Sequence, residues 1–258
     1  MNTRFSRNIP QPETGNDEIA AAVDLIPAPY TATLSRRFGV HVDTTSSPSA
    51  TFVPESYEPN YAYPLLIWLH DEGGSERDLL TLMPVISNRN YFGMSLRGPL
   101  EARHAQPGFR WSHFVDDVIA VEEELYDQVG RLRRAYNIHS ERVFVGGCGD
   151  GATAAMHLGL RRPEWFAGVV SLGGCLPAME KPLSKYRLLQ GKRVLLARGN
   201  DSNIVDELRT RGLATLLHTA GMTVCSRIYG NPHPQERDVA HDIDRWMMRE
   251  CYRHVTVE

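Results

Sequence analysis

Short apolar runs alternate with longer amphipathic runs along residues 51 to 258. The short runs have the length and apolar content of buried strands, and the long runs carry apolar residues at helical spacing. Strands are predicted over 51–54, 64–70, 91–97, 142–147, 166–172, 192–199 and 223–230, and helices over 115–136, 153–161, 206–220 and 238–251. Because each parallel crossover needs a helix, the alternation predicts an α/β fold, with a doubly wound, mostly parallel sheet and helices on both faces.

The longest predicted helix, 115–136, has its apolar residues along one side. We expect this side to face the core and the charged residues to face largely away from it. The apolar residues are Val115, Val118, Ile119, Leu125, Val129 and Leu132, and the charged residues are Glu122, Glu123, Arg131 and Arg133.

The first 50 residues differ in composition from the rest of the chain. They are rich in Pro, Ser, Thr and Asn, which is typical of an extension or linker. One short edge strand is expected there, at Phe38–Val42. The pattern predicts a polar N-terminal extension over 1–50 and one folded domain over 51–258.

Composition is that of an ordinary globular protein, with 42% hydrophobic and 23% charged residues. The 31 acidic and 28 basic residues nearly balance and no run of like charge stands out, so no nucleic-acid partner is expected. The longest apolar stretch is far shorter than the roughly 20 residues that cross a bilayer. The polar N-terminus makes a poor signal peptide. We therefore expect a cytoplasmic protein without a membrane span.

The cysteines do not have the spacing of a metal site. Cys148, Cys175, Cys225 and Cys251 lie 27, 50 and 26 residues apart, without the close pairs that bind zinc. We expect neither a metal nor a cofactor.

Residues 142–174 contain an apolar strand, a glycine-dense turn and a helix rich in small residues. This is the setting in which α/β-hydrolases place the nucleophile elbow, G-x-S-x-G. From about residue 51 to 258 the chain resembles the phospholipase/carboxylesterase group of that superfamily, which includes acyl-protein thioesterases and esterases related to polyester depolymerases and feruloyl esterases. The segments that carry the resemblance are PLLIWLHDEGGSERDL (64–79), NYFGMSLRGP (90–99), PEWFAGVVSLGGCLP (163–177) and YGNPHPQERDVAHDIDRWM (229–247).

The resemblance places the nucleophile at position 149. The group has Arg-Val-Phe seven residues ahead of its nucleophile and a helix-ending proline fourteen residues after it; Arg142 and Pro163 both indicate Gly149. The flanking glycines are present as Gly147 and Gly151. Acyl transfer needs an oxygen or sulfur that attacks the carbonyl, and glycine supplies neither.

Cys148 is an alternative nucleophile, because the dienelactone-hydrolase branch uses cysteine in a similar G-x-C-x-G turn. That register would place Asp150 where the last glycine belongs, and it would break the agreement with Arg142 and Pro163. In the preferred register the side chain of Cys148 points away from the site, where a packing role is expected.

The resemblance also assigns the other members of the triad, in the order nucleophile, acid, base. Asp201, which follows the strand at 192–199, matches the acid, although Asp206 stays an alternative because the loop is one residue short. His233 matches the base, where the Asp would fix its tautomer and stabilise the imidazolium.

The oxyanion hole is expected from the backbone N–H groups of Glu72 and Asp150. His70 is expected to be a structural residue at the strand end, and Asp71 replaces the usual glycine of the group. The carboxylates of Asp71, Glu72 and Asp150 would oppose a developing negative charge if they turned inward.

Three hypotheses for function follow. The first is a degenerate hydrolase, a pseudoenzyme that keeps the pocket of a carboxylic-ester or thioester hydrolase and binds a small ester or acyl ligand, or a protein partner, without turnover. The second is an active hydrolase in which His233 and Asp201 activate a water molecule. The third is a hydrolase that uses Cys148.

Overall fold

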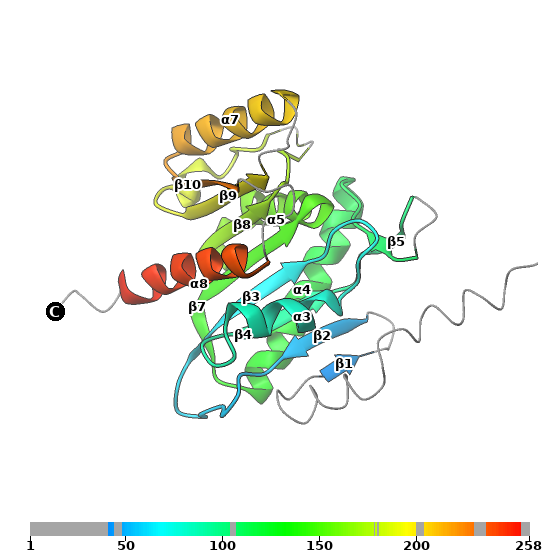
Figure 1. The fold of residues 1–258 in the computed structure, drawn as a ribbon, viewed down its shortest axis with the longest axis vertical. Helices are drawn as coiled ribbons and strands as arrows, with labels where there is room; N and C mark the ends of the chain where they lie inside the picture. Colours follow the sequence, from blue (N-terminus) through cyan, green and yellow to red (C-terminus); the bar gives the residue numbers. More distant parts are fainter. Residues whose placement is uncertain are drawn as a thin grey trace, which may run out of the picture.

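The computed structural model describes residues 41–43, 48–103, 107–177, 179, 181–199, 204–229 and 236–253. Its main sheet has eight strands in the order β1-β2-β4-β3-β7-β8-β9-β10 (Figure 1). These strands are β1 (His41–Asp43), β2 (Ser49–Phe52), β3 (Tyr63–Leu69), β4 (Phe92–Leu96), β7 (Ile138–Cys148), β8 (Gly168–Leu172), β9 (Arg193–Gly199) and β10 (Thr223–Tyr229). A separate small hairpin pairs β5 (Leu100–Glu101) with β6 (Phe109–Arg110).

The helices of the described residues are α3 (Asp78–Ile86), α4 (Val115–Ala135), α5 (Gly149–Arg161), α6 (Tyr186–Leu189), α7 (Ile204–Thr219) and α8 (Glu236–Arg253), with a 3-10 turn at Pro163–Trp165. Among them no helix is long and apolar enough to cross a membrane.

The sheet is parallel from β4 to β10, and only the β1–β2 and β2–β4 pairs are antiparallel. Each face carries its own apolar core: one contains residues of α4, α5 and α7, and the other contains residues of α3 and α8. Figure 1 shows α3 and α8 together on one face. All seven residues of β3 are buried because helices cover both faces. The predicted doubly wound α/β fold is confirmed.

The start of the sheet lies close to the predicted boundary between extension and domain. β1 overlaps the expected edge strand, whose residues 38–40 lie outside the described residues. β1 and the first two residues of β2 precede residue 51. The division of the chain at residue 50 stays a prediction.

Two helices differ from the prediction: one was not predicted at all, and the other begins earlier than predicted. α3 was not predicted; it buries Leu79, Leu80, Met83 and Ile86, and Pro84 within it weakens the helical signal. α5 begins at Gly149 rather than at residue 153. The glycines of this segment are typical of a turn, but tertiary contacts described below make it the first turn of the helix.

The expectation for α4 was wrong at three positions. Val118, Leu125, Val129 and Leu132 are buried as predicted, whereas Val115 and Ile119 are exposed. Glu122, expected to face away, is 2% exposed. It lies against α5, where its carboxylate accepts hydrogen bonds from the Nε groups of Arg161 and Arg162. Two guanidinium groups, one from the last residue of α5 and one from the residue that follows it, compensate this charge inside the interface.

Candidate active site

The sharp turn from β7 into α5 places Gly149 at the carboxyl end of the sheet. Gly149 has a φ of +50°, a conformation that residues with side chains rarely adopt. The flanking glycines allow the end of β3 to approach this turn. A Cβ on Gly147 would lie 2.5 Å from the carbonyl oxygen of Leu69, and one on Gly151 would lie 2.2 Å from the same oxygen.

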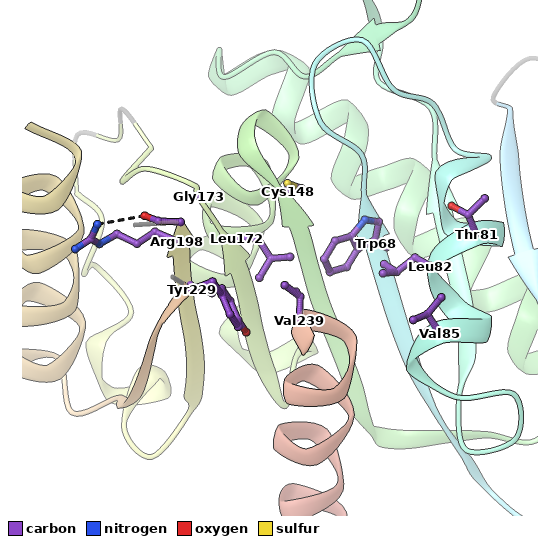
Figure 2. Close-up of a pocket in the computed structure, with 12 residues that line it drawn as sticks. Trp68, Thr81, Leu82, Val85, Cys148, Leu172, Gly173, Arg198, Tyr229 and Val239 are labelled. Carbon is purple, nitrogen blue, oxygen red and sulfur yellow. Dashed lines mark hydrogen bonds between the residues drawn. The ribbon is translucent and has the colours of Figure 1, made fainter. Parts of the chain in front are cut away.

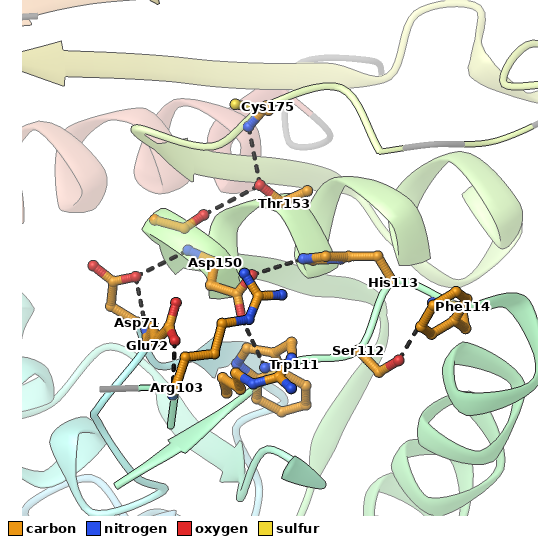
Figure 3. A network of polar contacts seen from close by, with 12 residues as sticks. Asp71, Glu72, Arg103, Trp111, Ser112, His113, Phe114, Asp150, Thr153 and Cys175 are labelled. Atoms are coloured by element: carbon orange, nitrogen blue, oxygen red, sulfur yellow. Dashed lines mark hydrogen bonds and ion pairs between the residues drawn. The ribbon is translucent and has the colours of Figure 1, made fainter. Parts of the chain in front are cut away.

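The two N–H groups expected to form the oxyanion hole converge on one oxygen atom. Oδ1 of Asp71 accepts a hydrogen bond from the N–H of Glu72 at 2.7 Å and from the N–H of Asp150 at 2.9 Å (Figure 3). The N–H of Asp150 points outward because this residue is in the first turn of α5, where backbone donors have no partner within the helix. The geometry therefore binds an anion at this point, and that anion is a side chain of the protein.

The Asp71 carboxylate also fills the space that a side chain at position 149 would need. A Cβ built on Gly149 would lie 2.0 Å from Oδ1 and 2.6 Å from Oδ2 of Asp71. A larger residue at 149 and the present position of Asp71 are therefore incompatible.

The other two carboxylates turn away from this point. Oε1 of Glu72 accepts a hydrogen bond from the N–H of Arg103 at 3.0 Å. Asp150 receives bonds of 2.7 Å from Nε2 of His113 and from the N–H of Trp111. Burial by itself would raise the pKa of Asp150, but these two bonds, together with the nearby charges of His113 and Arg103, hold the pKa below its usual value.

His70 holds the loop that carries Asp71. Its Nε2 accepts a hydrogen bond from the N–H of Gly98 at 2.9 Å, so its Nδ1 carries the proton and donates to the carbonyl oxygen of Asp71 at 2.7 Å. Trp111 donates through Nε1 to the carbonyl oxygen of His70. Desolvation lowers the pKa of the buried His70 ring. Both ring nitrogens are used in structural contacts, as expected for a structural residue.

Cys148 lines an apolar cleft of about 350 Å³ (Figure 2). The cleft lies at the carboxyl ends of the central strands, between α3 and the start of α8, and its apolar lining includes Trp68, Leu82, Val85, Leu172 and Val239. Burial raises the pKa of the Cys148 thiol to about 11, and the nearby Asp71 adds to this. Since the thiolate is the nucleophilic form, this environment suits packing better than catalysis.

The remaining predicted site residues are not placed. Asp201 and His233 lie outside the described residues, and Asp206 lies in α7 without a described side chain. The strands that precede the two loops, β9 and β10, end beside the apolar cleft at Gly199 and Tyr229.

Sequence reasoning placed Asp71 in the oxyanion loop, but it did not say which of the carboxylates of Asp71, Glu72 and Asp150 turns inward. The sequence contained a signal for the inward turn of Asp71. This chain has an acidic residue in place of the usual glycine of the group, and it also lacks the hydroxyl at position 149. The apolar cleft was not predicted in detail, since its walls come from seven separate segments.

Known proteins with similar sequences are esterase-like. A model of the Phospholipase/Carboxylesterase family matches residues 115–257, more than half of the chain. NocK of Nocardia uniformis subsp. tsuyamanensis, named as a candidate esterase, is 28% identical over 136 residues. The matched region is 52% of this chain and 37% of NocK, so the chain matches little more than a third of this relative.

Several solved structures with similar folds are named as esterases. The Bacillus cereus carboxylesterase matches with a TM-score of 0.63 at 21% identity, over 80% of this chain and 96% of its own. The Mesorhizobium loti carboxylesterase matches with a TM-score of 0.63 at 18% identity, over 81% and 98%. A thermostable esterase matches with a TM-score of 0.57 at 18% identity, over 84% and 64%.

At these identities the structural likeness is evidence for the fold alone, and it confirms the predicted α/β-hydrolase fold. The family model extends from the start of α4 through the elbow turn to the end of α8. The chain belongs to the phospholipase/carboxylesterase family.

Proposed function

We propose that this protein is a catalytically impaired member of its family, which binds a small carboxylic ester or acyl compound without efficient turnover. The observation that carries the proposal is the position of Asp71. Its carboxylate occupies both N–H donors of the expected oxyanion hole and the space next to Gly149 where a serine side chain would stand.

Two requirements of acyl transfer are unmet in this arrangement. No hydroxyl or thiol extends from position 149, so no covalent acyl intermediate can form there. The hole holds a carboxylate, which would repel the negative charge that develops on a substrate carbonyl oxygen. In a serine protease, loss of the nucleophile alone lowers kcat by about 10⁶-fold, or about 8 kcal/mol of barrier.

The apolar cleft supports the ligand class. Its walls are mostly aliphatic and aromatic, and its volume of about 350 Å³ lies within the range of small-molecule sites. Each buried methylene of an acyl chain would contribute about 0.8 kcal/mol. The cleft reaches Cys148, the residue directly before Gly149, so a chain bound there would have its polar end near the elbow turn.

The test is hydrolysis of p-nitrophenyl acetate and p-nitrophenyl octanoate by a short series of variants. We expect the parent and Gly149→Ser to be inactive, because the new side chain and Asp71 compete for one space. Asp71→Gly frees the space beside position 149 and the two N–H donors of the oxyanion hole, and Gly149→Ser supplies the hydroxyl. The double variant is therefore expected to hydrolyse the esters. Asp71→Gly combined with Gly149→Ala is the matched control that lacks the hydroxyl.

Adding His233→Ala to the active double variant is expected to abolish its activity. Three results contradict the proposal. Parent activity that His233→Ala removes would show water activation by His233 and Asp201; parent activity that only Cys148→Ala removes would show a thiol nucleophile. A folded but inactive Asp71→Gly/Gly149→Ser protein would show that the nucleophile does not belong at position 149.

A further inference from the structure

The main sheet ends at β10, which has no strand on its outer side within the described part of the chain (Figure 1). β10 has seven residues, no proline, and a continuous register with β9. Natural proteins protect many edge strands with proline, bulges or charged side chains. β10 has one charged residue, Arg227, and Asp242 of α8 already pairs with it at 3.4 Å. The usual devices against strand pairing are therefore missing from this edge.

The hydrogen bonds between β10 and β9 fix which residues of β10 point outward. The N–H of Thr223 donates to the carbonyl oxygen of Lys192 at 2.8 Å, on the β9 side. In a parallel pair, alternate residues of a strand bond to the neighbouring strand. The odd-numbered residues of β10 therefore bond to β9. The even-numbered residues, Val224, Ser226 and Ile228, direct their N–H and C=O groups to the outer edge.

These outward groups are almost without partners. Among the described residues, they have one printed contact, from Nη1 of Arg227 to the carbonyl oxygen of Ser226 at 3.2 Å. A carbonyl oxygen has two lone pairs, so it can accept a second bond. Three N–H groups and three C=O groups of the edge can therefore bond to an incoming strand.

An exposed apolar side chain lies on the same edge. Ile228 is 59% exposed, whereas Val224, on the same face of the strand, packs against the core that contains residues of α7. β-branched side chains on neighbouring strands pack well against each other. A strand that pairs with β10 and has an apolar residue opposite Ile228 would cover this side chain.

We propose that β10 pairs with β10 of a second copy of this chain, antiparallel and centred on Ser226, so that the two main sheets become one continuous sheet. In this register Ser226 lies opposite its own copy, and Val224 lies opposite the partner's Ile228. The three pairs that the outward residues form have two backbone hydrogen bonds each, which gives six. The dimer does not depend on the proposed function of the apolar cleft.

The sequence of β10 is complementary to itself in this register. The two apolar residues of the edge, Val224 and Ile228, meet each other, and Arg227 lies opposite the partner's Cys225 rather than opposite a like charge. A two-fold axis at the level of Cys225 or Arg227 would leave only two such pairs, with four bonds. Antiparallel pairing is also the arrangement that a two-fold axis generates, so it gives a closed dimer.

Analytical ultracentrifugation tests whether the dimer forms. We expect the average mass to rise from 29.0 kDa toward twice this value over a range of about 1–100 μM. Ser226→Pro removes an outward N–H and places a ring on the two-fold axis, but it breaks no bond to β9. Proline is tolerated at such edge positions, so this variant is expected to stay folded and to raise the dimer Kd at least about tenfold.

Phe114→Lys is the control for the surface change. Phe114 is 80% exposed at the start of α4, which Figure 1 shows well separated from β10. Its substitution is expected to leave the dimer Kd unchanged within about twofold, whereas Ile228→Lys, which places a charge on the edge, is expected to raise it.

A cross-link tests the register. Residues of a hydrogen-bonded antiparallel pair have Cα atoms about 5.5 Å apart, which is within the range of a disulfide. Ser226→Cys is made together with Cys175→Ser, which removes an exposed thiol. With oxidised glutathione as the oxidant, we expect this variant to form a covalent dimer on a non-reducing gel.

Ile228→Cys in the same Cys175→Ser background is the matched control. In the proposed register the two copies of position 228 lie four residues, or about 13 Å, apart along the strands, so this variant is expected not to cross-link. The proposal is overturned if the parent keeps a mass of 29.0 kDa over the whole concentration range, or if Ser226→Pro dimerises like the parent. It is also overturned if Ile228→Cys cross-links as fast as Ser226→Cys.

Discussion

At the scale of single residues, positions 71 and 149 depend on each other. The group that this chain resembles has glycine at position 71 and a nucleophile with a side chain at position 149. In this chain the sizes are reversed, with Asp71 at the first position and Gly149 at the second. Oδ1 of Asp71 satisfies two backbone N–H groups that would otherwise lack a protein partner. Asp71 therefore holds the loop and the helix start together, and under the proposed function it takes the place of a substrate carbonyl.

A thermodynamic cycle at these two positions measures their coupling. We expect Gly149→Ala to destabilise the protein by about 2–3 kcal/mol, because φ is +50° and the new Cβ would meet Asp71. In the background of Asp71→Gly, the same substitution should cost only about 1 kcal/mol from backbone strain. Urea denaturation of the four proteins gives the coupling, and a value below about 0.5 kcal/mol would contradict the steric interpretation.

Gly212→Ala is the control for this cycle. Gly212 lies on an exposed position of α7 where a Cβ would meet nothing within 4 Å. Alanine has a higher helix propensity than glycine, so this substitution should stabilise the protein by up to about 1 kcal/mol.

At the scale of elements, the contact between α4 and α5 depends on a buried charge. Glu122 reaches from α4 to the end of α5, where Arg161 and the following residue, Arg162, neutralise it. Removal of one member of such a buried group leaves the other charges without a partner, which is more damaging than loss of a surface ion pair.

Glu122→Ala is therefore expected to lower the free energy of unfolding by about 3 kcal/mol or more. The matched control is Glu123→Ala, one residue along the same helix and exposed, which should change the stability by less than about 0.5 kcal/mol. Urea denaturation at pH 7 measures both. Equal effects of the two substitutions would mean that the Glu122 group does not stabilise the interface.

The elements that could be predicted from sequence are those whose pattern is local. The central strand β3 is a continuous apolar run, because burial on both faces leaves no polar positions to interrupt it. α3 and the start of α5 could not be predicted, since Pro84 and the glycines of 147–151 are locally unfavourable and tertiary contacts outweigh this. The inward turn of Glu122 depends on arginines that are distant in sequence.

The candidate site could also be predicted only where the sequence pattern is local. Motif spacing identified Glu72 and Asp150 as the sources of two N–H groups, and the structure brings these groups onto one oxygen. Spacing carries no information on side-chain rotation. It therefore could not distinguish Asp71, which turns into the site, from Glu72 and Asp150, whose carboxylates turn out of it.

At the scale of the whole molecule, buried histidines make the stability depend on pH. Desolvation lowers the pKa of His157 to about 4, with Arg161 and His113 lowering it further and Glu122 opposing them. The pKa of His70 is also lowered by burial. In the unfolded chain both histidines titrate near 6.5, so between pH 6.5 and about 4 the unfolded state binds more protons than the folded state.

The free energy of unfolding is therefore expected to fall as the pH is lowered from 7 to 4.5, with His157 contributing up to about 3 kcal/mol. Carboxyl groups whose pKa is lowered in the folded state, such as Asp150 and Glu76, add a further loss only near and below pH 4.5. Urea denaturation at half-unit intervals should show a shallower slope for His157→Gln than for the parent. His218→Gln, at an exposed position of α7, should keep the parent slope. Equal slopes for the parent and His157→Gln would show that His157 is not held neutral in the folded protein.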